Sequence, residues 1–312
     1  MKILVTGASG LVGSALVPFL TARGHLVIRL TRTPVGMQEH DLSWDPDAGR
    51  LDVSALEGLD AAVHLAGESI AQRWTDDAMR RILDSRVNGT RLLARALAAL
   101  ERPPRVAVCA SAVGYYGDRG SEELTEDSSS GSGFLAEVCR QWEQAAAGMA
   151  ERGTRLVVLR LGMILSEAGG ALARMLPPFR LGAGGKLGSG EQYVSWVALD
   201  DLLEIVLFAL ANPLLHGPVN AVAPNPVTNV EFTRTLGRVL RRFTLVRVPA
   251  FAIRLMFGKM GKEVLLASAR VKPARLVAAG FAFRYPELEP ALRRALGRDR
   301  RIEQVNRSLP RV

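Results

Sequence analysis

The 312-residue sequence has little cysteine and histidine, with two and four residues respectively, and no long apolar run. Two scattered cysteines build neither a disulfide framework nor a metal site, and the histidines show no ligand spacing, so no structural metal is expected. The best apolar run, residues 205–210, is far too short to cross a bilayer. No charged and apolar leader precedes the first apolar segment. We therefore expect a cytoplasmic protein with no membrane partner.

Aromatic residues are also scarce, at 6% of the chain, whereas 40 Lys and Arg face 31 Asp and Glu. A basic balance can indicate nucleic-acid binding, but here the basic residues are not interleaved with aromatics and no nucleic-acid motif is present. We expect a solvated basic surface and no specific nucleic-acid partner. The remaining expected partner is a small-molecule substrate. The sequence leaves its identity and the oligomeric state open.

A glycine-rich turn is the most informative feature that is present. Residues 2–6 are typical of a buried strand, and an apolar helix follows the turn. Such a strand–turn–helix unit presents backbone N–H groups and the positive end of a helix to a pyrophosphate. Gly7 is expected to make the turn, Gly10 to let the phosphates approach, and Gly13 to let the helix pack closely. The residues expected around the pyrophosphate are Gly7, Ser9, Gly10, Leu11, Val12 and Gly13.

The second predicted strand, residues 25–30, indicates which dinucleotide is bound. In dinucleotide-binding folds the tip of this strand meets the adenosine ribose, and an acidic residue there binds a free 2′-hydroxyl. The tip here is Thr31-Arg32, with no acid. A guanidinium suits a 2′-phosphate, because it pairs with phosphate oxygens through two hydrogen bonds. We therefore predict NADP(H) rather than NAD; the alternative is that Arg32 is a solvated surface residue.

Strand and helix patterns alternate through the first half of the chain. Residues 61–65, 105–110 and 155–160 are predicted strands, and residues 78–99 and 134–151 are predicted helices. Short apolar strands separated by helices are typical of a parallel sheet covered on both faces, which binds ligands at the carboxyl ends of its strands. The predicted fold class is α/β, a doubly wound parallel (Rossmann) sheet with a smaller, mostly helical C-terminal cap.

The pattern changes after Leu161. A Gly- and Pro-rich segment follows, and residues from about 223 onward are predicted to be mostly helical. Residues 194–197 and 217–222 are expected to return to the main sheet. The predicted boundaries are 1–165 plus about 194–222 for an NADP-binding Rossmann domain, and 166–193 plus about 223–312 for a substrate-binding cap domain.

Together these features resemble the atypical extended short-chain dehydrogenases/reductases of the NAD-dependent epimerase/dehydratase superfamily. The closer resemblance is to the epimerase-like subfamily with a C-terminal domain of unknown function, some members of which are labelled cell-division-inhibitor-like. The resemblance implies NADP binding and leaves the substrate unknown. The segments that carry it are the glycine turn and residues 64–67, 111–117, 134–143, 196–201, 222–229 and 280–283.

The resemblance breaks at the family's catalytic pair, Tyr-x-x-x-Lys. With Glu143 aligned to the glutamate that usually follows this pair, Leu135 stands at the tyrosine position and Cys139 at the lysine position. The usual catalytic serine falls at Ala112. Leucine carries no proton, and a thiol provides no fixed positive charge, so neither performs the usual role.

Four residues near the predicted cleft remain as catalytic candidates. Ser111 could orient a carbonyl, Tyr115 or Tyr116 could donate a proton, and Cys139 could titrate if its surroundings lower its pKa. The alternatives are that the tyrosines only pack and bond their hydroxyls, and that Cys139 is an ordinary buried helix residue.

Further residues are expected along the cofactor. Arg86 could contact a phosphate or a substrate anion, or pair with Asp84 or Glu68. The expected cofactor-lining residues beyond the glycine turn and Arg32 are Leu65, Ala66, Gly67, Glu68, Arg86, Ser111 and Gly162.

Three functions are compatible with these observations. The first is an NADP(H)-dependent oxidoreductase or epimerase/dehydratase-like enzyme of unknown substrate. The second is a non-catalytic NADP(H)-binding sensor or regulator, which loss of the catalytic pair favours. The third is an interaction scaffold, supported only by charge. The loop at 182–195 favours a substrate site, with Lys186, Gln192 and Trp196 as candidate lining residues; Lys186 could equally be a solvated cation. Residues 200–201 are expected to cap the following helix.

Overall fold

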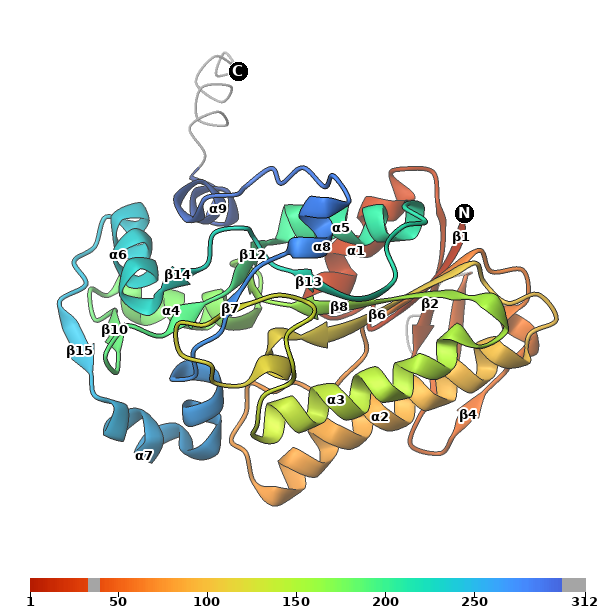
Figure 1. Cartoon of the computed structure of the whole chain (residues 1–312), viewed down its shortest axis with the longest axis horizontal. Helices are drawn as coiled ribbons and strands as arrows, with labels where there is room; N and C mark the ends of the chain where they lie inside the picture. Colours follow the sequence, from red (N-terminus) through yellow and green to blue (C-terminus); the bar gives the residue numbers. More distant parts are fainter. Residues whose placement is uncertain (33–39, 299–312) are drawn as a thin grey trace, which may run out of the picture.

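The computed structural model describes residues 1–32 and 40–298 (Figure 1). In this part of the chain eight strands form the central sheet, in the order β13-β8-β6-β5-β1-β2-β3-β4. Every neighbouring pair is parallel except β3 and β4, which are antiparallel. The strands are β1 (Lys2–Thr6), β2 (Leu26–Thr31), β3 (Asp41–Asp45), β4 (Arg50–Leu51), β5 (Ala61–His64), β6 (Val106–Ala112), β8 (Arg155–Leu161) and β13 (Gly217–Ala221).

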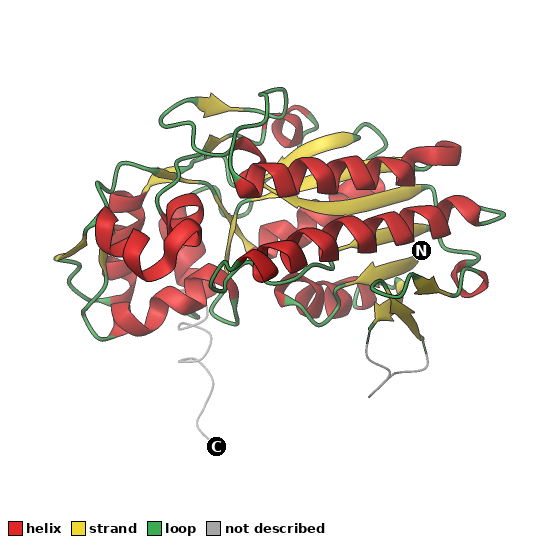
Figure 2. Cartoon of the chain, turned by 90° about the horizontal axis from the view of Figure 1, so that it is seen from below, coloured by secondary structure: helices red, strands yellow, loops and turns green. Residues whose placement is uncertain are grey.

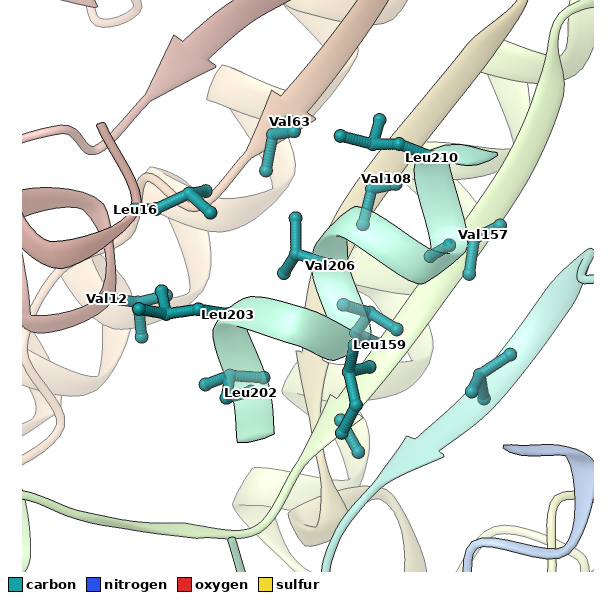
Figure 3. Close-up of a cluster of buried hydrophobic side chains, with 14 of the residues drawn as sticks. Val12, Leu16, Val63, Val108, Val157, Leu159, Leu202, Leu203, Val206 and Leu210 are labelled. Carbon is teal, nitrogen blue, oxygen red and sulfur yellow. The ribbon is translucent and has the colours of Figure 1, made fainter. Parts of the chain in front are cut away.

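Helices cover both faces of this sheet, which confirms the doubly wound fold. On one face α1 (Leu11–Thr21) contacts α5 (Leu199–Ala211), and on the other α2 (Asp76–Ala99) lies beside α3 (Phe134–Ala147) (Figure 2). The alternation along β1 accounts for both layers, because successive side chains of a strand point to opposite faces. Ile3 and Val5 join the cluster under α1 and α5 (Figure 3), and Leu4 joins the cluster under α2.

The long helix α2 is defined by its own sequence. The Thr75 side chain accepts a hydrogen bond from the backbone N–H of Ala78, and Asp76 and Asp77 lie in the first turn. A capping hydroxyl and early acidic residues both stabilise the positive end of a helix. Leu93 and Leu97, placed at helical spacing, turn one face of α2 to the sheet, where they share a buried cluster with Leu4.

A second apolar core lies toward the C-terminal half, where the predicted helical region is found. Phe179, Phe232, Leu236 and Leu292 are among its buried residues. The helices that supply it are α4 (Gly170–Arg180), α6 (Asn229–Leu240) and α9 (Leu288–Ala295). The same half of the chain also contains α7 (Ala250–Met260) and α8 (Ala274–Ala278), and α8 packs on the first core through Leu276. Short strands pair as β10 (Gly185–Leu187) with β15 (Val246–Val248), β11 (Tyr193–Val194) with β14 (Val227–Thr228), and β7 (Glu123–Leu124) with β16 (Arg270–Val271).

The expected return of residues 194–197 to the main sheet is wrong, whereas β13 does join its edge. Instead β12 (Trp196–Ala198) pairs with β9 (Met163–Leu165), which continues the chain beyond β8. Successive side chains of β12 point to opposite sides, so Trp196 and Ala198 pack in the second core and Val197 packs in the first. This places β12 between the two cores and not within the main sheet. The domain boundaries given above stay a prediction.

Two kinds of feature are absent from the described residues. No helix among them is long and apolar enough to span a membrane. No cluster of three or more His, Cys, Asp or Glu side chains that could hold a metal ion occurs in residues 1–32 and 40–298.

Candidate functional site

The glycine turn connects β1 to α1 at the carboxyl edge of the sheet. Gly7 has a φ of +67°, and a Cβ there would lie 2.8 Å from the backbone N of Ala66. A Cβ on Gly13 would lie 2.2 Å from the carbonyl oxygen of Gly7. Both positions therefore require glycine for the close packing of turn, strand and helix.

Gly10 differs from these two glycines, because it is exposed and only one atom lies within 4 Å of the place of its Cβ. The nearest atom that a Cβ at Gly10 would meet is the Gly7 oxygen, at 3.3 Å. Gly10 is also the N-cap of α1, and its position provides no side-chain hydrogen bond to the first helical N–H groups. The turn therefore leaves donors and space for an anion such as pyrophosphate. The Leu11 side chain approaches Gly169 and Gly170, so the start of α4 lies over this turn.

A buried hydrogen-bond chain fixes the ends of β1 and β5 beside the turn. Thr6 Oγ1 accepts from the backbone N–H groups of Leu65 and Ala66, at 3.1 and 3.2 Å. The Thr6 hydroxyl therefore donates to His64 Nδ1, 2.7 Å away, and His64 Nε2 donates to Thr90 Oγ1 at 2.9 Å. Burial lowers the pKa of His64 to about 4, which keeps the ring neutral at pH 7.

Arg32 lines a hollow of about 610 Å³ at the tips of β2 and β3. Arg50, on β4, lines it as well and pairs with Asp45 at 2.8 Å. Asp47 and Asp52 also line it, so the hollow carries both signs of charge. Sequence reasoning missed Arg50. The signal available was the Asp-Ala-Gly turn before it, which predicts a hairpin returning to the tip of β3.

Arg86 extends from α2 to the carboxyl end of β5. Its Nη1 donates to the carbonyl oxygens of Glu68 and Ile82, at 2.9 and 3.1 Å, and the guanidinium lies 4.9 Å from the Trp142 ring centre. A Cβ on Gly67 would lie 3.2 Å from Arg86 Cζ, so Gly67 makes room for this side chain. Among the described residues no carboxylate pairs with Arg86, and burial lowers its pKa. The expected contact with a ligand anion stays a prediction.

Leu135 and Cys139 lie on the side of α3 that faces the turn after β6. A Cβ on Gly114 would lie 3.2 Å from Leu135 Cβ and 3.8 Å from Cys139 Sγ. The Cys139 thiol donates to the Ala112 carbonyl oxygen at 3.7 Å. Burial, and next the charge of Glu143, raise the pKa of Cys139 to about 11. The condition set for Cys139 to titrate, a lowered pKa, is therefore not met.

Ser111 belongs to a charged cluster that sequence reasoning missed. Its hydroxyl donates to Glu143 Oε1 at 2.7 Å, and Glu143 forms an ion pair with Arg160 on β8. The available signal was an arginine directly after the apolar run 156–159, since a buried arginine needs a carboxylate partner.

The two tyrosines differ in how their hydroxyls are used. Tyr116 is fully buried, and its hydroxyl lies 2.7 Å from Asn220 Oδ1 while accepting from Arg160 Nη1 at 2.9 Å. Burial raises the pKa of Tyr116. Tyr115 is half-buried with its ring 3.5 Å from Arg160 Cζ, and no hydrogen bond of its hydroxyl is found within residues 1–32 and 40–298. The geometry therefore favours Tyr115 over Tyr116 as a proton donor.

Several other candidates make contacts that hold the fold together. A Cβ on Gly162 would lie 2.7 Å from the Ser195 carbonyl oxygen, so backbone packing alone requires this glycine. Lys186 donates to the Ser189 carbonyl oxygen, Gln192 is buried and donates to that of Leu187, and Trp196 is fully buried.

The expectation that residues 200–201 cap their own helix is wrong. The N-cap of α5 is Ala198, and it has no side-chain hydrogen bond. Instead the Asp201 carboxylate accepts the backbone N–H groups of Arg284 and Tyr285, both at 2.9 Å. It thereby fastens the segment before α9 to the start of α5.

A model for the NAD dependent epimerase/dehydratase family matches residues 3–221, which include the glycine turn, Arg86, Ser111 and Arg160. The chain belongs to this family. A model for a domain of unknown function, DUF1731, matches residues 248–295. The two matches confirm the resemblance to epimerase-like proteins with such a C-terminal domain.

Relatives of this epimerase family match along nearly the whole chain. Epimerase family protein Mb2239 of Mycobacterium bovis is 42% identical over 93% of this chain and 96% of its own. The structure of human epimerase family protein SDR39U1 with NADPH has a TM-score of 0.87 and 37% identity, covering 95% of this chain and 99% of that one. A nucleoside-diphosphate sugar epimerase from Corynebacterium glutamicum has a TM-score of 0.80 and 36% identity, covering 100% of this chain and 62% of that one.

Proposed function

We propose that this protein binds NADP(H) at the carboxyl edge of its sheet and transfers a hydride to or from a small-molecule substrate. The assignment of NADP(H) rests on the likeness to the human relative solved with NADPH and on the exposed position of Gly10 at the start of α1. A cytoplasmic location and the absence of a specific nucleic-acid partner stay predictions.

The residues at the edge fit each part of NADP(H). Backbone N–H groups from Gly7 to Val12 would hold the pyrophosphate at the start of α1. Arg32 and Arg50 would hold the 2′-phosphate, since both line the hollow at the tip of β2. The path along residues 65–68 would lead to Arg86, whose guanidinium has no carboxylate partner in the described chain.

The protein must supply a proton without the family's usual pair. Bound NADP(H) supplies or accepts the hydride, and a side chain supplies or removes the accompanying proton. Leu135 cannot, and burial holds Cys139 as a thiol with a pKa of about 11. We assign the proton to Tyr115, because the Tyr116 hydroxyl is fully used by its buried partners.

The non-catalytic sensor remains the second candidate, because Leu135 and Cys139 stand against the turn after β6, where the resemblance places the catalytic pair. Both functions require NADP(H) binding. A screen with sugar nucleotides and small carbonyl compounds separates them. Oxidation of NADPH, reduction of NADP⁺, or conversion of the sugar nucleotide with no net change in the cofactor would each show turnover and support the enzyme. A protein that binds NADPH tightly and turns over none of these compounds supports the sensor.

The test of cofactor binding is a fluorescence titration with NADPH and with NADH. We expect NADPH to bind at least about tenfold more tightly, because a charge-assisted hydrogen bond contributes about 1.5–3 kcal/mol. Arg32→Ala and Arg50→Ala should each weaken NADPH binding and leave NADH binding unchanged. Arg23→Ala is the matched control, because this exposed arginine lies in the turn between α1 and β2, where β2 begins. Equal affinities for NADPH and NADH would contradict the assignment.

A further inference from the structure

The helix α7 presents apolar side chains to solvent instead of to the core. Phe251, Leu255 and Met256 are 72%, 84% and 67% exposed. Ile253 is the buried residue of this helix. Residues i and i+4 lie on the same side of a helix, so Phe251 and Leu255 form one outward stripe. Figure 1 shows α7 at the end of the molecule opposite β4.

The segment that leads into α7 carries two more exposed apolar side chains. Phe243 and Leu245 are 83% and 84% exposed, and β15 follows directly. Single exposed apolar residues are normal, but a group of large ones in one stretch of chain marks an interaction site. We call Phe243, Leu245, Phe251, Leu255 and Met256 the α7 face.

The segment that carries the α7 face is basic, and one acid of another element, Asp76 of α2, lines a hollow together with Leu255 and Met256. Residues 241–262 contain no Asp or Glu, and all their Lys and Arg side chains are exposed. No ion pair of these cations occurs within residues 1–32 and 40–298. The acid that follows, Glu263, is turned inward, where its Oε2 accepts the backbone N–H of Leu135 at 3.0 Å. The cations are Arg241, Arg242, Arg247, Arg254, Lys259 and Lys262.

We propose that the α7 face docks on an anionic lipid bilayer. Exposed apolar side chains enter the boundary between headgroups and acyl chains, and the cations around them bind lipid phosphates. A second copy of the chain would bring two sets of these cations together, so charge opposes self-pairing through this face. Nucleic acid would satisfy the cations but leave Leu245, Leu255 and Met256 without apolar partners.

A helix that docks on a bilayer lies in the membrane plane and needs no long apolar run. The lack of a membrane-spanning helix among the described residues is therefore compatible with this surface. The proposal therefore revises the expectation of no membrane partner. It is independent of the cofactor, since none of the α7-face residues belongs to the glycine turn or its surroundings.

The test is sedimentation of the full chain with vesicles of phosphatidylcholine alone or mixed with phosphatidylglycerol. We expect binding to the mixed vesicles to be at least about tenfold stronger and to weaken as salt rises. Leu255→Glu and the pair Arg247→Ala/Arg254→Ala should each lower binding at least about tenfold. Leu214→Glu is the matched control, because Leu214 is 78% exposed outside the α7 face.

Three results would overturn the proposal. One is no sedimentation with the mixed vesicles at low salt. Another is an equal loss of vesicle binding for Leu255→Glu and Leu214→Glu. The third is a dimer in analytical ultracentrifugation that Leu255→Glu dissociates while vesicles are not bound, which would assign the face to self-association. Each variant is also titrated with NADPH, and unchanged affinity shows that it is folded. Vesicle binding and cofactor binding can then fail separately.

Discussion

Arg160 on β8 and Glu143 on α3 form a two-bond ion pair, with Nη2–Oε2 and Nε–Oε1 distances of 2.8 and 2.9 Å. The Arg160 side chain is 3% exposed and that of Glu143 15%. The same pair binds the hydroxyls of Ser111 and Tyr116. One pair of opposite charges thus orients the end of the serine-bearing strand and attaches α3 to the sheet.

Removing one member of this pair should destabilise the protein strongly. Glu143→Gln leaves the Arg160 charge buried without a counter-charge, and such losses cost about 3–5 kcal/mol. The double variant Glu143→Gln/Arg160→Met removes the charge as well and should be more stable than Glu143→Gln alone. Urea unfolding of the wild type, Glu143→Gln, Arg160→Met and the double variant measures both effects. A double variant whose loss equals the sum of the two single losses would show that the residues act independently.

The neutral His64 predicts a loss of stability in acid. The folded pKa of about 4 lies below the ordinary 6.5, so between these values the unfolded chain binds a proton that the folded protein does not. The contribution is complete above pH 6.5 and falls as the pH drops towards 4, by about 2 kcal/mol at pH 5. Urea unfolding at pH 7 and pH 5 should show this fall, and His64→Gln should lessen it. An unchanged pH dependence in the variant would contradict the assignment.

A lysine introduced at position 139 should be destabilised by the positive charge of Arg86. Burial and the charge of Glu143 raise the pKa of Cys139, and the Arg86 guanidinium acts in the opposite direction, so both charges act at position 139. Cys139→Lys would add a second buried cation near Arg86 and should destabilise the protein. The loss should be smaller than the cost of about 3–5 kcal/mol for an uncompensated buried charge, because the Glu143 carboxylate offsets part of it. Adding Arg86→Asn should restore much of that loss, as measured by urea unfolding. Cys139→Met, which is uncharged and of similar length, separates the effect of charge from that of size.

Tyr115 and Tyr116 should respond differently to the loss of the hydroxyl. Tyr116→Phe leaves buried polar groups unsatisfied and should destabilise the protein by about 1–3 kcal/mol. Tyr115→Phe should change stability by less than about 0.5 kcal/mol, because no hydrogen bond is lost in the described structure. With a substrate in hand, Tyr115→Phe should lower kcat and leave the affinity for NADPH unchanged. Full turnover by Tyr115→Phe would remove Tyr115 as the proton donor.

The elements that could be predicted from sequence are those defined by neighbouring residues. The glycine turn and the strands on either side of it have local signals, and the parallel sheet follows from the alternation of strands and helices. Arg50 was missed although the Asp-Ala-Gly turn before it is a local hairpin signal, because the strand that carries Arg50 has only two residues. Asp201 looks like a helix cap, yet its partners lie more than 80 positions away in the chain. Tertiary pairing of this kind has no local pattern.

The ribbon formed by β9 and β12 has a consequence for how the molecule melts. Its residues alternate between the two cores, with Val197 in one and Trp196 and Ala198 in the other. If the packing of either core loosens, β12 loses its contacts on one face, and its contacts with the other core weaken as well. Heat should therefore melt the protein as one cooperative unit, with a single calorimetric peak. Because one strand contributes side chains to both cores, the two cores cannot rotate relative to each other about a hinge at this ribbon.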